Sequence, residues 1–220
     1  LLAIAPGTGP TTHYTPGQPL LIAICYMLFG INSDGELARQ LQRLVFSCLL
    51  FASLPSFALR LGLPARAGLI AGLAGAVLPL HILQELRGSG AILDSLFIAA
   101  FTLASFALWQ RPEGFSPAAG VRQGLLLGIA CLFNPVIVSL AAGFGLYALY
   151  RFPARRRAVF LHYAAAAAVC LLCLLPWAFY NQQRMGKFVL IRGNFPLEMS
   201  LSFHPKAEVL LKDAWLVPGA

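Results

Sequence analysis

The sequence predicts an all-α membrane protein, a polytopic bundle of about six transmembrane helices with one further helix at the membrane interface. Apolar residues make up 59% of the chain, charged residues only 11%, and the mean hydropathy is +0.75. Soluble domains carry roughly 25% charged residues, so the chain lies well outside that class. Several continuous apolar stretches also approach the ~20 residues that a helix needs to cross a hydrocarbon core of ~30 Å.

The elements are expected in the following order. Residues 1–36 form an extracytoplasmic loop that contains an apolar helix at 18–30. Because a helix of about 13 residues is too short to cross a bilayer, it is placed at the interface. A transmembrane helix bundle occupies residues 37–180, and residues 181–220 form a truncated extracytoplasmic segment with some strand character at 187–191. The expected spans are 37–61, 66–84, 91–109, 119–133, 135–150 and 158–180.

The apolar run 124–150 is long enough for one span but is expected to form two. Arg122 stands near its start and the arginine-rich segment 151–157 follows its end, so a single crossing would place these basic groups on opposite sides. Pro135 removes an intrahelical hydrogen bond and disfavours helix at Asn134 before it. A break at this point returns both basic groups to one face, and it leaves two short spans of the kind that border a cavity.

The short links between spans set the expected orientation. With the break in place, Arg60, Arg66, Arg111, Arg122 and the segment 151–157 share one face, which becomes cytoplasmic because basic residues in short loops stay inside. Eight basic residues fall on each side, but all the acids except Glu113 fall outside. We therefore expect a multi-pass protein of the cell (inner) membrane with an extracytoplasmic active face. The same scattering of basic residues argues against a nucleic-acid partner, despite the formal net charge of +8.

Three candidate pocket residues lie at the predicted outer face. His81 and Glu85 close one span, and Asp94 opens the next just inside its outer end. An ionisable group within a span costs at least ~2.5 kcal/mol at the bilayer centre and is a functional candidate by default, with helix capping as the alternative for Asp94. His81 and Glu85 are one helical turn apart and can either share a metal ion or form an ordinary hydrogen-bonded pair. Because two residues do not make a metal site, we predict no metal site and no cofactor, and a role for a divalent metal stays open.

A second group of residues on that face can bind anions. His13 and Tyr14 lie in the first loop, and Arg184 and Lys187 follow the last span. Basic side chains can hold a phosphate by charge-assisted hydrogen bonds, while anchoring at the interface and plain solvation are the alternatives. The sequence shows no Ser/His/Asp arrangement, phosphate loop or zinc spacing. The residues alone therefore predict a membrane protein with an outer polar pocket and no particular reaction.

Four segments, in order, resemble one superfamily of membrane enzymes. They read GPTTHYTPGQPLLIAICYMLFG, GAILDSLFIAAFTLASFALW, GLLLGIACLFNPVIVSL and LLPWAFYNQQRMGKFVLIRGNFPLEM. The first resembles the end of the first external loop of the GT-C fold glycosyltransferases that use polyprenyl-linked donors, and the second their span that opens with an acidic residue. The third resembles their Gly-Leu-rich helix that ends at a proline, and the last their Pro-Trp segment with the loop after it. Protein O-mannosyltransferases and aminoarabinose transferases belong to this superfamily.

The resemblance implies a helix bundle of the GT-C type and a membrane glycosyltransferase. Such an enzyme moves a sugar from a polyprenyl-phosphate-linked donor to a lipid, glycan or protein acceptor on the extracytoplasmic face. The principal catalytic acid of these enzymes lies in the first external loop, which would precede Leu1, so we expect the main base outside this chain. The pocket residues implied are Asp94, Glu85 and His81, and the donor-phosphate residues implied are His13, Tyr14, Arg184, Lys187 and Asn181.

Two other functions stay open from the sequence. A transporter or flippase for a polyprenyl-linked sugar needs polar residues along the whole depth of the membrane and access from both faces. A non-catalytic membrane assembly subunit needs no site of its own. The polar residues are predicted to cluster on the outer face, which favours the transferase.

Overall fold

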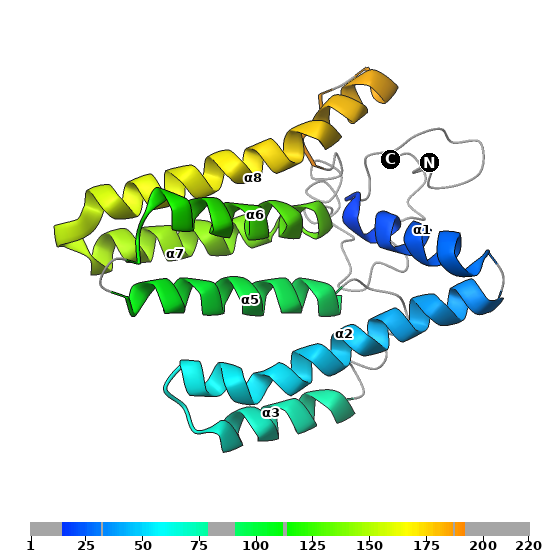
Figure 1. The fold of residues 1–220 in the computed structure, drawn as a ribbon, viewed down its shortest axis with the longest axis horizontal. Helices are drawn as coiled ribbons and strands as arrows, with labels where there is room; N and C mark the ends of the chain where they lie inside the picture. The colour runs from blue at the N-terminus through cyan, green and yellow to red at the C-terminus, as the bar shows by residue number, and fades with distance from the viewer. Residues whose placement is uncertain (1–14, 32, 79–90, 112–113, 187, 192–220) are drawn as a thin grey trace, which may run out of the picture.

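The computed structural model describes residues 15–31, 33–78, 91–111, 114–186 and 188–191. Within these ranges the chain is helical and contains no strand, which confirms the predicted all-α class. Figure 1 shows α5, α6, α7 and α8 side by side, with α2 and α3 packed as a hairpin beside them. The helices are α1 (Gly17–Phe29), α2 (Ser33–Arg60), α3 (Ala65–Val77), α5 (Ala91–Trp109), α6 (Pro117–Phe133), α7 (Ile137–Arg151) and α8 (Arg156–Met185), and a short 3-10 helix, η1 (Pro153–Arg155), precedes α8.

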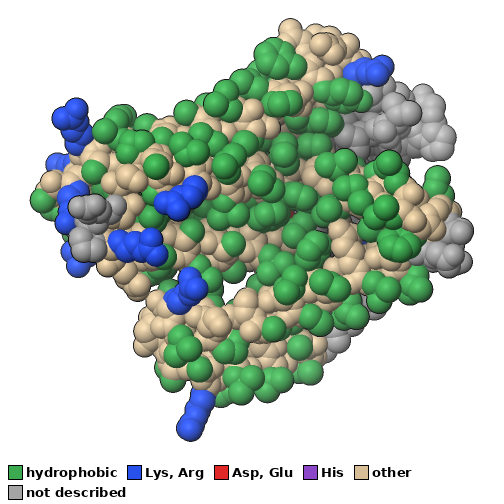
Figure 2. Space-filling view, in the orientation of Figure 1, with side chains coloured by type: hydrophobic (Ala, Val, Ile, Leu, Met, Phe, Trp, Pro, Cys, Tyr) green, Lys and Arg blue, Asp and Glu red, His purple; other side chains and the backbone are tan. Residues whose placement is uncertain are grey.

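The outer surface of these helices is apolar. Among the described residues, three segments are long and apolar enough to cross a membrane, namely Leu37–Arg60, Ile92–Trp109 and Pro153–Met185. In the most apolar 18-residue stretch of each segment, only 17%, 17% and 28% of the residues are buried. Figure 2 shows hydrophobic side chains along the lengths of the helices. Exposed apolar surface of this extent is unfavourable in water and is typical of contact with lipid. The surface therefore indicates a membrane protein.

Helix length does not establish all six predicted spans. Three of the corresponding helices, α3, α6 and α7, have 13, 17 and 15 residues. A straight crossing needs about 17–25 residues, so α6 is at the lower limit while α3 and α7 fall below it. The predicted span 66–84 extends beyond α3 into residues 79–90, which lie outside the described ranges.

The predicted break in the run 124–150 is confirmed. Helix α6 ends at Phe133, just before Asn134 and Pro135, and α7 begins after them at Ile137. They run antiparallel, because Phe115, just before α6, packs against Ala148 near the end of α7. The Asn-Pro corner therefore lies at one end of the bundle, and the segment 151–157 lies at the other (Figure 1).

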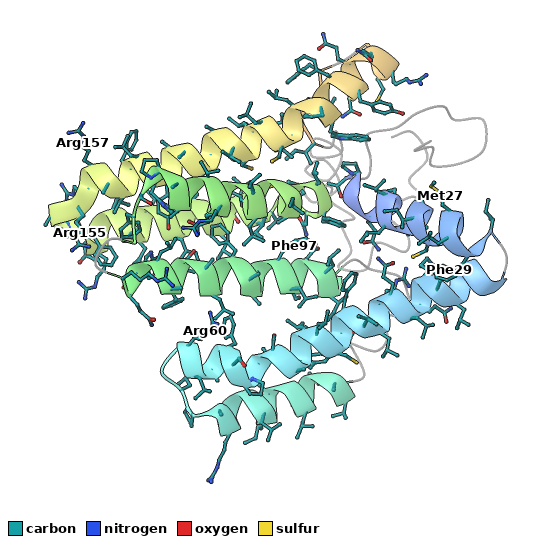
Figure 3. All side chains as sticks on the ribbon, in the orientation of Figure 1. Met27, Phe29, Arg60, Phe97, Arg155 and Arg157 are labelled. Carbon is teal, nitrogen blue, oxygen red and sulfur yellow. The ribbon has the colours of Figure 1, made fainter. Side chains whose placement is uncertain are left out.

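The two ends of the bundle differ in charge. We call the end that holds the start of α5 and the α6–α7 corner the Asp94 end, and the opposite end the basic end. Figure 2 shows Lys and Arg side chains gathered at the basic end, and Figure 3 places Arg60, Arg155 and Arg157 there. The exposed arginines of the basic end are Arg60, Arg66, Arg111, Arg122, Arg151, Arg155, Arg156 and Arg157.

The helices α6 and α8 pack closely, because α6 presents a glycine to α8 at every fourth position. A Cβ built on Gly124 would lie 2.5 Å from the carbonyl oxygen of Ala166, and one built on Gly120 would overlap the carbonyl oxygen of His162. Gly128 would bring a Cβ to 2.6 Å from that of Cys173. Repeated small residues at this spacing allow the backbones of membrane helices to approach closely. These three glycines therefore set the distance between α6 and α8.

The last helix continues past its predicted end at residue 180. It runs to Met185 and ends at Gly186, whose φ of 67° is the left-handed conformation typical of helix C-termini. The chain then folds back, since Trp177 Nε1 donates to the carbonyl oxygen of Ile191 at 2.8 Å and Asn181 Nδ2 donates to that of Val189 at 2.9 Å. The predicted strand character is wrong for the described part, 188–191, because α8 side chains bond these carbonyls and no strand is present there.

Candidate functional site

The α6–α7 corner and the start of α5 form a carboxylate–amide pair. Asn134 Nδ2 donates to Asp94 Oδ2 at 2.7 Å. Asn134 Oδ1 accepts from the backbone N–H of Val136 at 3.1 Å, and this bond leaves the NH₂ group directed at Asp94. Asp94 lies in the first turn of α5, where the positive end of the helix dipole stabilises a carboxylate. The corner that Pro135 creates therefore also positions the carboxylate predicted from the sequence.

A cavity of about 130 Å³ opens beside this pair. Its polar side chains are those of Asp94, Asn134 and Ser139, and the rest of its wall is apolar. Figure 3 places Phe97 in the space between α5 and the helices above it, and its ring lies 5.3 Å from that of Phe133. The cavity is lined by Asp94, Phe97, Ile98, Ala130, Asn134, Val136, Ile137, Ser139 and Leu140.

A second, more open space of about 460 Å³ continues along the same helices toward the basic end. It adjoins the first cavity because Ser139 and Leu140 line both. Its other residues are largely aromatic: Phe106, Trp109, Gly143, Phe144 and Tyr147. We call the two spaces together the α5–α7 groove; it has a carboxylate and an amide at one end and apolar, aromatic walls along the rest.

The remaining predicted donor-phosphate residues are only partly described. Arg184 is exposed on the last turn of α8, with its guanidinium carbon 5.9 Å from the centre of the Tyr180 ring. Asn181 is only 2% exposed, and its amide donates to the backbone of Val189. A phosphate contact from Asn181 stays a prediction that this burial does not support. The other predicted residues, His13, Tyr14, His81, Glu85 and Lys187, lie outside the described ranges.

Metal ligation finds no support in the part of the chain that the structure describes. No group of three or more His, Cys, Asp or Glu side chains there is arranged to hold a metal ion. The suggested His81–Glu85 metal pair falls in residues 79–90, outside the described ranges.

A buried polar cluster that was not predicted from the sequence lies between α5, α6 and α8. His162 Nδ1 lies 3.0 Å from the carbonyl oxygen of Ser116, and its Nε2 lies 2.6 Å from Gln123 Oε1. Gln123 Nε2 donates to Ser105 Oγ at 2.8 Å, and Ser105 donates to the Phe101 carbonyl oxygen at 2.9 Å. His162, Gln123 and Ser105 are at most 3% exposed. Polar residues inside apolar helical runs were the signal in the sequence, because such groups seldom face lipid.

The fold and the site together define a class, a helical membrane protein with a carboxylate–amide pair at the mouth of an apolar groove. No family model matches this chain, and neither a curated protein nor a solved structure matches it.

Proposed function

We propose that this chain belongs to a membrane glycosyltransferase that uses a polyprenyl-phosphate-linked sugar. The observation that carries the proposal is the Asp94 carboxylate, held at 2.7 Å by Asn134 at the mouth of the α5–α7 groove. Chemistry on a lipid-linked sugar needs polar groups at the membrane surface and an apolar path for the chain of the lipid. The Asp94 end offers the first, and the aromatic walls of the groove offer the second.

Asp94 has the chemistry to orient an acceptor hydroxyl. An ionised carboxylate accepts the hydrogen bond of a hydroxyl group, and this favours attack by its oxygen. Asn134 uses one of its two N–H groups to fix the position of this carboxylate. In the proposal Asp94 orients the acceptor hydroxyl. Arg184, at the same end of the bundle, is available to neutralise the departing phosphate.

The proposal takes all six apolar helices from α2 to α8 as membrane-crossing segments, with the Asp94 end outside the cell. The short helices α6 and α7 pack against α5 and the longer α8, so a short crossing of the pair is supported by its neighbours. A short hydrophobic length is also accommodated by local thinning of the bilayer. The excess of arginines at the basic end favours the cytoplasm for that end.

A flippase for the same lipid is the second candidate. The observation that favours it is the length of the groove, which continues from Asp94 past Ser139 toward Trp109 and Tyr147. A translocation path for a sugar needs polar groups along its whole depth. The polar side chains deeper in the bundle, those of His162 and Gln123, are buried and do not line the groove. We therefore prefer the transferase.

The proposal is tested by sugar transfer in the full-length protein. With a radiolabelled polyprenyl-phosphate sugar in proteoliposomes, Asp94→Asn should lower the transfer rate by a factor on the order of 100 or more, as expected for an acid–base group. Glu113→Gln serves as the matched control, because it removes the one acid predicted on the opposite side. Equal rates for Asp94→Asn and the wild type would remove Asp94 from the site. Movement of the labelled lipid between leaflets without any transfer would overturn the transferase in favour of the flippase.

A further inference from the structure

The basic end contains a turn that the proposed transferase does not use. Four exposed arginines, Arg151, Arg155, Arg156 and Arg157, fall between the last residue of α7 and the first turn of α8. The turn is fixed to the bundle, because the Phe152 ring packs edge-on against that of Phe115 with ring centres 5.2 Å apart. The short helix η1 joins the two longer helices within this stretch. The four guanidinium groups, which we call the basic turn, are therefore attached to a rigid backbone.

Exposed aromatic residues place the basic turn at the level of lipid headgroups. Tyr150, in the last turn of α7, is 81% exposed, and Phe160, in the second turn of α8, is 62% exposed. Tyrosine side chains that project from membrane helices gather at the boundary between headgroups and acyl chains, and an exposed phenylalanine next to them faces the acyl chains. Because one helical residue rises about 1.5 Å, Arg157 lies within about 5 Å of Phe160 along the axis of α8.

Positive charge at this end is concentrated. Arg111 and Arg122, from the ends of α5 and α6, add to the four arginines of the basic turn. The N-terminus of α8 contributes a further partial positive charge, and its first turn contains no acidic residue. The sequence provides one acid in the connecting segments at this end, Glu113, which lies outside the described residues. Clustered positive charge of this kind attracts anions.

We propose that the basic turn binds the phosphate of an anionic phospholipid in the adjoining leaflet. One guanidinium group can donate hydrogen bonds to two oxygens of a phosphate at once. Figure 3 shows Arg155 and Arg157 at the outer extremity of the bundle. A bilayer supplies phosphates at the depth that Tyr150 and Phe160 mark, and clusters of basic residues next to membrane helices attract anionic lipids. This inference does not depend on the proposed function.

Native mass spectrometry of the intact chain in detergent tests the proposal. The protein is titrated with phosphatidylglycerol and, separately, with phosphatidylcholine. We expect phosphatidylglycerol to bind the wild type more tightly. The triple variant Arg155→Gln, Arg156→Gln, Arg157→Gln should lose affinity for it by about fivefold per charge, on the order of 100-fold in all. Binding of phosphatidylcholine should change little.

The matched control replaces the same three arginines by lysine. Charge is then kept, so phosphatidylglycerol affinity should stay within about tenfold of the wild type. A wild-type affinity in the glutamine variant would overturn the proposal, as would an equal loss in the lysine variant. Displacement of the lipid by millimolar inorganic phosphate would also overturn it, because the site would then select free phosphate instead of a lipid.

Discussion

Replacing Gly124 by leucine should prevent the helix bundle from folding. A Cβ at this position would lie 2.5 Å from the carbonyl oxygen and 2.8 Å from the Cα of Ala166, and both are backbone atoms of α8. Backbone cannot rotate away as a side chain can, so α6 and α8 would have to separate. Overpacking by even one or two methyl groups costs about 1–3 kcal/mol, and leucine adds more than that. Size-exclusion chromatography in detergent should show aggregated protein, and Gly124→Ala should already lower the unfolding temperature.

Gly143 provides the matched control for this prediction. It lies in α7, and a Cβ added there meets nothing within 4 Å. Gly143→Ala should leave the unfolding temperature unchanged or raise it, because alanine favours a helix by about 1 kcal/mol over glycine. The same gain in helix propensity applies to Gly124→Ala. An unchanged unfolding temperature in that variant would show that α6 and α8 do not approach as closely as described.

Replacing His162 by leucine should destabilise the bundle by about 2–3 kcal/mol, although the two side chains are similar in size. The substitution removes the partner of Gln123 Oε1, which lies 2.6 Å from His162 Nε2, and the Gln123 side chain is only 3% exposed. A buried polar group without a partner costs about 1–3 kcal/mol. Thermal unfolding in detergent measures the loss, and Phe160→Leu on the exposed face of α8 should show little change.

The double variant His162→Leu, Gln123→Leu separates the hydrogen bond from packing. When both partners become apolar, no buried amide is left unsatisfied, and the change approaches neutrality. The double variant should therefore be more stable than His162→Leu alone. If it is less stable by the full sum of the single losses, the two side chains do not interact and the cluster is not a network.

The helices could be predicted closely from the sequence because their boundaries depend on local signals. Pro135 and the arginines on both sides of the apolar run gave the corner, and the predicted interfacial helix, 18–30, corresponds to α1. The predicted end of the last span, residue 180, lies before the end of α8 at Met185, because the residues from 181 onward are polar and contain Pro and Gly. In the structure Asn181 is buried and bonds the returning chain, which permits a helix there.

The contacts across helices could not be predicted in the same way. Asp94 was identified because a carboxylate inside an apolar span is unusual, but its pairing with Asn134 joins positions 40 residues apart. From the sequence, Asn134 was predicted only as a residue of the turn. The His162 cluster depends on residues from three helices, each of which is a single polar group in an apolar run. Their meeting follows from how α5, α6 and α8 pack, which periodicity alone does not define.

The account is tested most directly by which side of the membrane each end of the α6–α7 hairpin faces. Single cysteines at Pro117, Val136 and Pro153, in a chain whose native cysteines are replaced by alanine, can be labelled in sealed vesicles with a maleimide that does not cross membranes. We predict that cysteines at 117 and 153 react from one side and the cysteine at 136 from the other. Labelling of 117 and 153 from opposite sides would mean that α6 and α7 cross the bilayer as one unit, in contradiction to the hairpin and to the pocket built on it.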